Sequence, residues 1–282
     1  MASDRTIGIT PQPDSPYIID GGETGANRLA MLARVAAAQT ESFLLRAGVR
    51  PGSDCIDLGC GPGYVTGRIA ELAAPGRVVG VDFDPVVIDI ARRQTAALLH
   101  PPRFVVANVG AIPGALADAA QSFDVVYARF LLSHLPNAAA ALMRMAVLAR
   151  PGGVVAVEDV DAEAMFTHPH CPALDRVIEL SRQAAAKRGA DARVGPDLPG
   201  LFDRIGLEKV ELNTLQPSFR EGEGKDLLLV TFDTTRAAVS RAGLASEDEL
   251  DEIREELRAF VADPATIVSA PRVFQVMGRR PG

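Results

Sequence analysis

Residues 55–63 decide the fold, and they read Cys55-Ile56-Asp57-Leu58-Gly59-Cys60-Gly61-Pro62-Gly63. The first four form a short apolar run typical of a buried strand, and three glycines follow it. Glycine permits a tight turn and lets the backbone approach a ligand without a Cβ atom in the way. Because helical spacing begins directly afterwards, at 65–72, the stretch predicts a strand, a glycine turn and a helix.

The same order of strand and helix continues on both sides of this turn. Valine-rich apolar runs predict further strands at 78–82, 104–107, 123–127 and 154–157. Helical spacing fills most intervals between them, and two later runs, at 207–212 and 272–277, complete an expected set of seven strands. Apolar strands alternating with helices are typical of parallel sheets covered on both faces, and right-handed crossovers make such sheets doubly wound. We therefore predict an α/β, Rossmann-like fold with a mostly parallel sheet, whose ligands bind at the carboxyl ends of the strands.

Composition and charge exclude several classes of protein. Of 282 residues, 48% are hydrophobic and 23% charged, which is the usage of a folded protein rather than a disordered one. The excess of 36 acidic over 29 basic side chains gives a net charge of −7, which argues against a nucleic-acid partner. Three cysteines are too few for a disulfide framework, and no run approaches the ~18 apolar residues of a membrane span. With a polar, proline-rich start at 1–16, we expect a reduced, cytoplasmic chain without a membrane partner.

Asp82 ends the second predicted strand about 20 residues beyond the glycines, where a carboxylate suits the two hydroxyls of a ribose. The glycines do not fit the Gly-x-Gly-x-x-Gly pattern of dinucleotide-binding turns, because Tyr64 or Thr66 occupies the last place in either register. Each feature alone also fits an ordinary structure, either a tight strand-to-helix turn or a surface acid. Together, in this order and at this spacing, they indicate a nucleoside site.

Four stretches together resemble the class I S-adenosylmethionine-dependent methyltransferases. In the order of that family they are Cys55–Gly63, Gly80-Val81-Asp82, Phe123-Asp124-Val125-Val126-Tyr127-Ala128-Arg129 and Leu148-Ala149-Arg150-Pro151-Gly152-Gly153. The resemblance covers residues 25–160 well and 194–279 more faintly. It is specific for the fold and the cofactor, and unspecific for the acceptor.

The resemblance implies how S-adenosyl-L-methionine would be held. The backbone of the turn would lie under the methionine part of the cofactor, a role that falls to Gly59, Cys60, Gly61 and Gly63. Asp57 would lie near the ammonium group, and Asp82, with Phe83 beside it, would take the ribose diol. Asn108 and the backbone of Val109 would meet the adenine. Because the family often has an acid at the position of Asn108, the amide implies a weaker contact.

The amino-terminal segment and the end of the fourth strand would close this site. Tyr17 looks like a lid residue over the cofactor, and Arg28 would meet the cofactor's carboxylate through a forked pair of hydrogen bonds. Arg129 begins a stretch to His134 that would wall the adenosine side and the methyl-transfer channel. A packing role for Tyr17 and a solvated position for Arg28 are the alternatives.

Few residues stand out for catalysis, because methyl transfer from a sulfonium is an in-line displacement that depends mainly on alignment. His134, after the fourth strand, is the candidate general base, and packing at a helix start is its alternative role. Asp159, after the fifth strand, is a catalytic candidate that would hydrogen-bond an acceptor N–H or hydroxyl. His168 and His170 are candidates to touch the substrate, together with Tyr17 and His134.

We expect no metal ion. Cys171 and the two histidines before it fall short of the four ligands of a structural zinc site. Glu158, Asp159 and Asp161 cluster where some O-methyltransferases hold a divalent cation, but a solvated acidic loop explains the same residues.

These features predict a methyltransferase acting on a small organic acceptor, an aromatic or heterocyclic metabolite or natural product of secondary metabolism. Residues 1–48 would form an arm and lid helix, 49–160 the cofactor-binding core, and 161–282 an acceptor-side insertion, closing strands and helical cap of the same domain. The helix expected at 247–262 has an apolar face that would pair two copies in a homodimer, formed by Leu250, Ile253, Leu257 and Val261.

Two other classes stay open. An NAD-dependent oxidoreductase shares the sheet, although it would need the missing third glycine. A regulator or cyclisation catalyst that binds S-adenosylmethionine without methyl transfer shares every binding motif.

Overall fold

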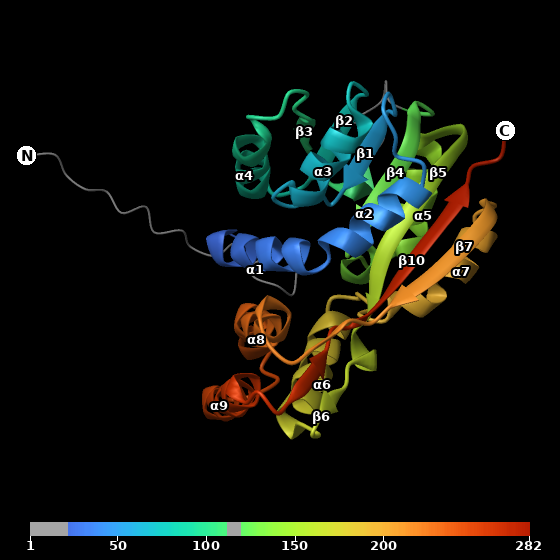
Figure 1. Ribbon diagram of the computed structural model, residues 1–282. Helices are drawn as coiled ribbons and strands as arrows, with labels where there is room; N and C mark the ends of the chain where they lie inside the picture. Colours follow the sequence, from blue (N-terminus) through green and yellow to red (C-terminus); the bar gives the residue numbers. More distant parts are fainter. Residues whose placement is uncertain (1–21, 112–119) are drawn as a thin grey trace, which may run out of the picture.

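A sheet of seven strands forms the central layer of the computed structural model, which describes residues 22–111 and 120–282 (Figure 1). The strands are β1 (Cys55–Leu58), β2 (Val78–Asp82), β3 (Arg103–Val106), β4 (Phe123–Arg129), β5 (Ala149–Asp161), β7 (Glu208–Leu215) and β10 (Arg272–Arg279). Their order is β3-β2-β1-β4-β5-β10-β7. The first five pair in parallel, and β10 runs antiparallel between β5 and β7. The predicted mostly parallel, doubly wound sheet is confirmed.

Strand order reverses beside β1, which pairs with β2 on one side and β4 on the other. A crevice opens at the carboxyl ends of parallel strands at such a reversal. The backbone N–H of Gly59, just after β1, donates to the carbonyl of Val81 at 2.8 Å, so the glycine turn is fixed against the end of β2.

Helices cover both faces of this sheet, as the alternation of strands and helices predicts. The helices of one face are α5 (Ala138–Leu148) and α7 (Val194–Arg204), and those of the other are α2 (Ala37–Arg46), α3 (Tyr64–Ala73) and α4 (Pro85–Thr95). Side chains of a strand alternate between the two faces, so Ile56 packs in the α5–α7 layer and Cys55 in the α2–α3 layer. Asp84 caps α4 by accepting the N–H of Val86 at 2.8 Å.

A helical cap lies beyond the carboxyl ends of β5 and β7 and the amino end of the antiparallel β10 (Figure 1). It contains α6 (Pro172–Ala186), α8 (Glu223–Arg241), α9 (Glu247–Ala262) and a small sheet of β6 (Thr167–His168), β9 (Ile267–Ser269) and β8 (Ser218–Phe219). Leu250, Ile253 and Leu257 of α9 are buried in a cluster with side chains of α6 and α8. The apolar face predicted to pair subunits is therefore used inside the chain, and the sequence argument for a homodimer no longer holds.

The first described helix, α1 (Gly22–Val35), joins the core to the cap. It packs against α8 on one side and against α3 and α4 on the other, and Figure 1 shows it between the two parts. Arg34 of α1 and Glu223 of α8 form an ion pair at 2.6 Å. The single helix predicted up to residue 47 is broken at Ala36, whose ψ of 4° departs from helical geometry.

Three short turns of 3₁₀ helix complete the described elements: η1 (Val109–Ala111), η3 (Leu132–His134) and η4 (Ala162–Ala164). Across the described residues, no helix combines the length and the apolar character needed to cross a membrane.

Candidate functional site

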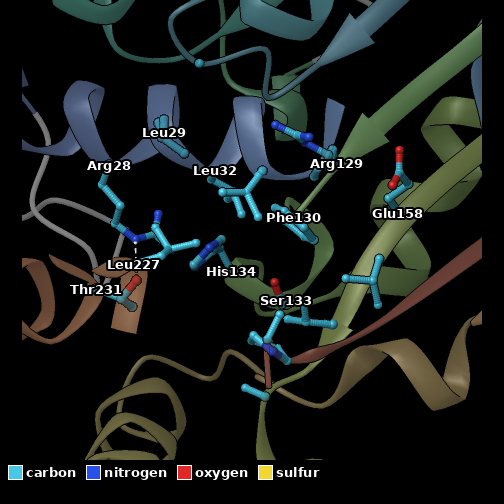
Figure 2. Close-up of a pocket in the computed structure, with 18 of the residues that line it drawn as sticks. Arg28, Leu29, Leu32, Arg129, Phe130, Ser133, His134, Glu158, Leu227 and Thr231 are labelled. Carbon is cyan, nitrogen blue, oxygen red and sulfur yellow. Dashed lines mark hydrogen bonds between the residues drawn. The ribbon is translucent and has the colours of Figure 1, made fainter. Parts of the chain in front are cut away.

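A cavity of about 390 Å³ lies where the sheet, α1 and the cap meet. Its core side is lined by the glycine turn, by Asp57 and Asp82, and by the stretch after β4 that ends at His134. Its cap side is lined mainly by apolar side chains of α6 and α8. Figure 2 shows α1 running along the top of this pocket, with Arg28, Leu29 and Leu32 on its walls.

The glycine turn has the backbone geometry that its sequence predicts. Gly59, Gly61 and Gly63 have φ values of +69°, +52° and +81°, a region that side chains with a Cβ rarely adopt. At Gly63 a Cβ would also lie only 2.8 Å from the Cβ of Ala91, so the close approach of α3 to α4 requires glycine there.

Asp82 is buried at the end of β2 and faces the cavity. Its carboxylate accepts the backbone N–H of Gly61 at 2.9 Å and that of Asp84 at 3.1 Å, so both flanking turns orient it. Burial raises the pKa of this carboxyl, and the two backbone donors partly oppose the rise. Phe83 also lines the cavity. The predicted ribose-binding acid is thus in a position to accept from a diol.

Asp57 is buried on β1 and also lines the cavity. The hydroxyl of Thr66 donates to it at 2.6 Å. Burial raises the pKa of this carboxyl to about 7, although the Thr66 hydrogen bond and the positive charge of Arg129 both favour the anion. Cys60, in the turn, lines the same wall, and burial raises the pKa of its thiol. A cation bound beside Asp57 would complete the ionisation of its carboxyl.

Three arginines line the cavity: Arg182 on α6, which pairs with Glu179 at 2.8 Å, and Arg129 and Arg28 on two other elements. Arg129, at the end of β4, donates to the hydroxyl of Thr40 at 3.2 Å. The central carbon of its guanidinium group lies 5.3 Å from the centre of the Phe130 ring. Arg28, on α1, donates through Nε to the hydroxyl of Thr231 on α8 at 3.2 Å. Burial and the charge of Arg129 lower the pKa of Arg28 to about 10, so it is charged at neutral pH. Within residues 25–110 and 120–282, whose side chains the structure describes, no carboxylate lies within ion-pair distance of Arg28 or Arg129.

The predicted adenine contacts lie at the end of β3, outside the walls of the cavity. Asn108 is exposed, and its side-chain oxygen accepts the N–H of Gly110 at 2.7 Å, while Val109 is buried in η1. Their adenine-binding roles stay predictions. Tyr17, predicted as a lid over the cofactor and substrate, lies outside the described residues.

Asp159 does not line the cavity, which corrects its prediction as a catalytic residue. Its side chain is completely buried and accepts the backbone N–H groups of Leu132 at 2.8 Å and Ser133 at 3.2 Å. A buried carboxylate that satisfies two backbone donors holds a turn rather than a substrate. Asp159 is therefore a positioning residue for η3, the turn that carries His134.

His134 lines the cavity from η3, as predicted, and Figure 2 shows it between Leu227 and Phe130. Burial and the charges of Arg28 and Arg188 lower the pKa of its imidazole to about 4. The ring is neutral at physiological pH and is a weak base. We therefore expect turnover to be flat across neutral pH even if His134 acts on the acceptor.

His168 and His170 are exposed and outside the cavity walls, which corrects their prediction as substrate-binding residues. His168 is exposed on β6, and Nε2 of His170 lies 2.6 Å from a carboxylate oxygen of Asp175 on the surface.

Three acids lie together at the end of β5, and each has a different hydrogen-bond partner. Glu158 accepts from the hydroxyl of Tyr127 at 2.7 Å, Asp159 holds η3, and Asp161 accepts the N–H of Glu163 at 3.2 Å. Among the described residues, no group of three or more histidine, cysteine or acidic side chains is arranged to hold a metal.

Sequence reasoning missed the contribution of α8. Leu227, Leu228, Thr231, Phe232 and Thr235 all line the cavity from this helix. Their spacing of three and four residues is the one signal that groups them on a single helical face. Nothing local in the sequence shows that this face meets α1.

Comparison with known proteins identifies the family to which this chain belongs. Residues 50–193 match a family model described as a methyltransferase domain, and the match covers half of the chain. The chain belongs to this family of class I S-adenosylmethionine-dependent methyltransferases. That membership disfavours the NAD-dependent oxidoreductase.

Three similar proteins show how far the likeness extends. "Probable methyltransferase ltbC" of Aspergillus luteorubrus is 27% identical over 235 residues, which cover 76% of this chain and 81% of that protein. Trans-aconitate 2-methyltransferase of Methylobacterium radiotolerans is 36% identical over 145 residues, but these span only 50% of this chain and 49% of the relative. The crystal structure of the cyclase SpnF has a TM-score of 0.54 at 16% identity, covering 88% of this chain and 82% of the other, and shows a shared fold.

Proposed function

We propose that this protein binds S-adenosyl-L-methionine and transfers its methyl group to a small organic acceptor held under the cap. The observation that carries the proposal is one cavity that joins Asp57, Asp82 and the glycine turn to the apolar side chains of α6 and α8. A donor and an acceptor that share one enclosed space can meet in line with little water between them.

The residues on the core side fit the donor chemically. Asp82 offers carboxylate oxygens to a ribose diol, Asp57 offers a carboxylate to an ammonium group, and the glycine turn keeps Cβ atoms away from the ligand. Arg129 lies close enough to Asp57 to lower its pKa, so a carboxylate on the same carbon as that ammonium falls within its reach. When bound, S-adenosyl-L-methionine supplies an electrophilic methyl group on a sulfonium.

The chain's own contribution to the reaction is alignment. Holding donor and acceptor in a productive geometry is worth ~7–11 kcal/mol of the barrier. Asp159 fixes the turn that carries His134 beside the acceptor space, and the apolar cap excludes water. A neutral His134 serves as a hydrogen-bond partner for an acceptor group.

The cap side favours a bulky apolar acceptor. Its walls are formed largely by leucine, valine and isoleucine side chains, with Phe232 and Met165 among them. Such walls bind a hydrocarbon or aromatic body by burial of apolar surface. This supports an aromatic or heterocyclic natural product of secondary metabolism as the acceptor, with a cytoplasmic location as the corresponding expectation.

Two measurements test the proposal. Calorimetry with S-adenosylhomocysteine is expected to show tight binding in the protein and weak binding in an Asp82→Ala variant. Incubation with S-adenosyl-L-methionine labelled on the methyl group, and with a panel of apolar acceptors, is expected to give S-adenosylhomocysteine and a labelled product. Failure to bind S-adenosylhomocysteine would refute the proposal.

A protein that binds the cofactor without methyl transfer is the second candidate. The shared fold of the cyclase SpnF supports it, because the same architecture occurs in a protein named for a different reaction. The labelling experiment separates the two, since a regulator or cyclisation catalyst binds S-adenosylhomocysteine but consumes no donor with any acceptor.

A further inference from the structure

Arg28 lines the cavity and contacts the cap through Thr231. Figure 2 shows its side chain descending from α1 toward Thr231, on the opposite side of Leu32 from Arg129. Its Nε donates to the Thr231 hydroxyl at 3.2 Å, and this bond connects residues 203 positions apart in the sequence. Because the Thr231 oxygen accepts this bond, its own proton is available for donation to a ligand.

The number of cationic groups exceeds what the donor requires. S-adenosyl-L-methionine has one carboxylate, and Arg129 lies on the core side near Asp57, where the methionine part of the donor would lie. Arg28 is then left with a hydroxyl as its partner among the described residues. In the open cavity water can solvate this guanidinium, but an apolar acceptor that displaces the water would leave the charge buried and uncompensated.

Most side chains near Arg28 and Thr231 are apolar, and the neutral ring of His134 is a polar neighbour. Leu227 and Leu228 flank Thr231 on α8, and α6 contributes Val177 and Ile178 to the same cavity. An isolated cation in such a wall selects a ligand that combines an apolar body with one anionic group.

We propose that the acceptor is an apolar molecule with a carboxylate, which Arg28 and the Thr231 hydroxyl bind at the cap side of the cavity. A carboxylate matches the two parallel donors of a guanidinium and its single charge, whereas a dianionic phosphate would require more donors than this pair supplies. The inference rests on the proposed function in one respect, namely that this cavity holds the acceptor. It also transfers the cofactor's carboxylate from Arg28, where the sequence placed it, to Arg129.

A matched set of probes tests this inference. Octanoate, octanol, octylamine and octyl phosphate share one alkyl chain and differ only in the head group. Calorimetry on the full chain saturated with S-adenosylhomocysteine is expected to show octanoate binding at least about tenfold more tightly than octanol, with octylamine weakest. Octyl phosphate binding more tightly than octanoate would overturn the choice of carboxylate.

Substitution of Arg28 identifies the residue that recognises the acid. In Arg28→Met, octanoate is expected to bind no better than octanol, while the Kd of octanol and that of S-adenosylhomocysteine stay near their original values. Arg28→Lys, which keeps the charge but not the fork, is expected to retain part of the preference. Arg182→Gln is the matched control, since it removes a charge from the cavity wall that is already paired with Glu179 at 2.8 Å. This control is expected to keep the full preference.

The outcomes separate the inference from the proposed function. If S-adenosylhomocysteine does not bind the unsubstituted protein, the proposed function fails. If it binds but octanoate has no advantage over octanol, or if the advantage survives Arg28→Met, the inference fails alone. A large loss of S-adenosylhomocysteine affinity in folded Arg28→Met would return Arg28 to the cofactor's carboxylate and would also overturn the inference.

Discussion

Binding of S-adenosylhomocysteine is expected to release protons, with Asp57 as their source. Burial raises the pKa of this carboxyl to about 7, so in the ligand-free protein half of the molecules carry a proton there at pH 7. The ammonium group of the ligand, placed beside Asp57, favours the carboxylate and lowers its pKa. Binding therefore becomes tighter as the pH rises toward 7.

The size of this effect follows from the pKa. A carboxyl with a pKa of about 7 is almost wholly protonated at pH 5.5 and half protonated at pH 7. If the bound form is ionised throughout, the apparent affinity rises about fifteenfold over this interval, or about 1.6 kcal/mol at 1.36 kcal/mol per tenfold. The proton release is about one per ligand at pH 5.5 and about one half at pH 7.

Calorimetry in two buffers of different ionisation enthalpy counts these protons directly. Asp57→Asn can still accept the Thr66 hydrogen bond but cannot titrate, so its affinity is expected to change much less over the same range. Asp89→Asn, on the surface of α4 where Asp89 pairs with Arg92, is the control and is expected to behave like the unsubstituted protein. The same pH slope in Asp57→Asn as in the original chain would refute the reasoning.

Three further predictions concern individual residues. Asp82→Ala removes an acceptor for two ribose hydroxyls at ~1.5–3 kcal/mol each and is expected to weaken S-adenosylhomocysteine about a hundredfold or more in calorimetry, and an unchanged Kd contradicts this role. Asp159→Ala leaves two buried backbone donors of η3 without their acceptor and is expected to lower the free energy of unfolding in urea by at least about 2 kcal/mol, and an unaltered midpoint argues against its positioning role. The pKa of His134 is lowered to about 4 in the folded protein, against about 6.5 for an ordinary histidine, so the unfolded chain binds a proton more readily between these pH values. The free energy of unfolding therefore falls as the pH drops from about 6.5 to 4, and His134→Gln is expected to lose less of it between pH 7 and pH 4 than the original chain.

The sheet could be predicted from the sequence because its signals are local. The apolar run before Gly59 and the valine-rich run before Asp82 each encode a buried strand within a few residues. The break between α1 and α2 has no such signal, since Ala36 is a good helix former without a neighbouring glycine or proline. That break arises because α1 packs on α8 while α2 packs on the sheet.

The candidate site divides in the same way. Asp57, Asp82 and the glycine turn were found because they lie close together in one strand–turn–helix–strand stretch. The partner of Arg28 could not be found, because Thr231 comes from a distant helix that only the cap brings near. The sequence predicts a catalytic role for Asp159 because it lies near the end of a core strand. Residues at that position can either face the cavity or hold a neighbouring turn, and Asp159 holds a turn. Pattern alone does not separate those two environments.

The position of α1 has a consequence for the order of events in turnover. One helix touches α3 and α4 beside the cofactor side of the pocket and α8 on the acceptor side, and an ion pair from Arg34 fastens it to the cap. Any displacement of α1 unseals both compartments together. The same movement of α1 then controls the exchange of ligands on the cofactor side and on the acceptor side. Higher solvent viscosity is therefore expected to slow exchange on both sides.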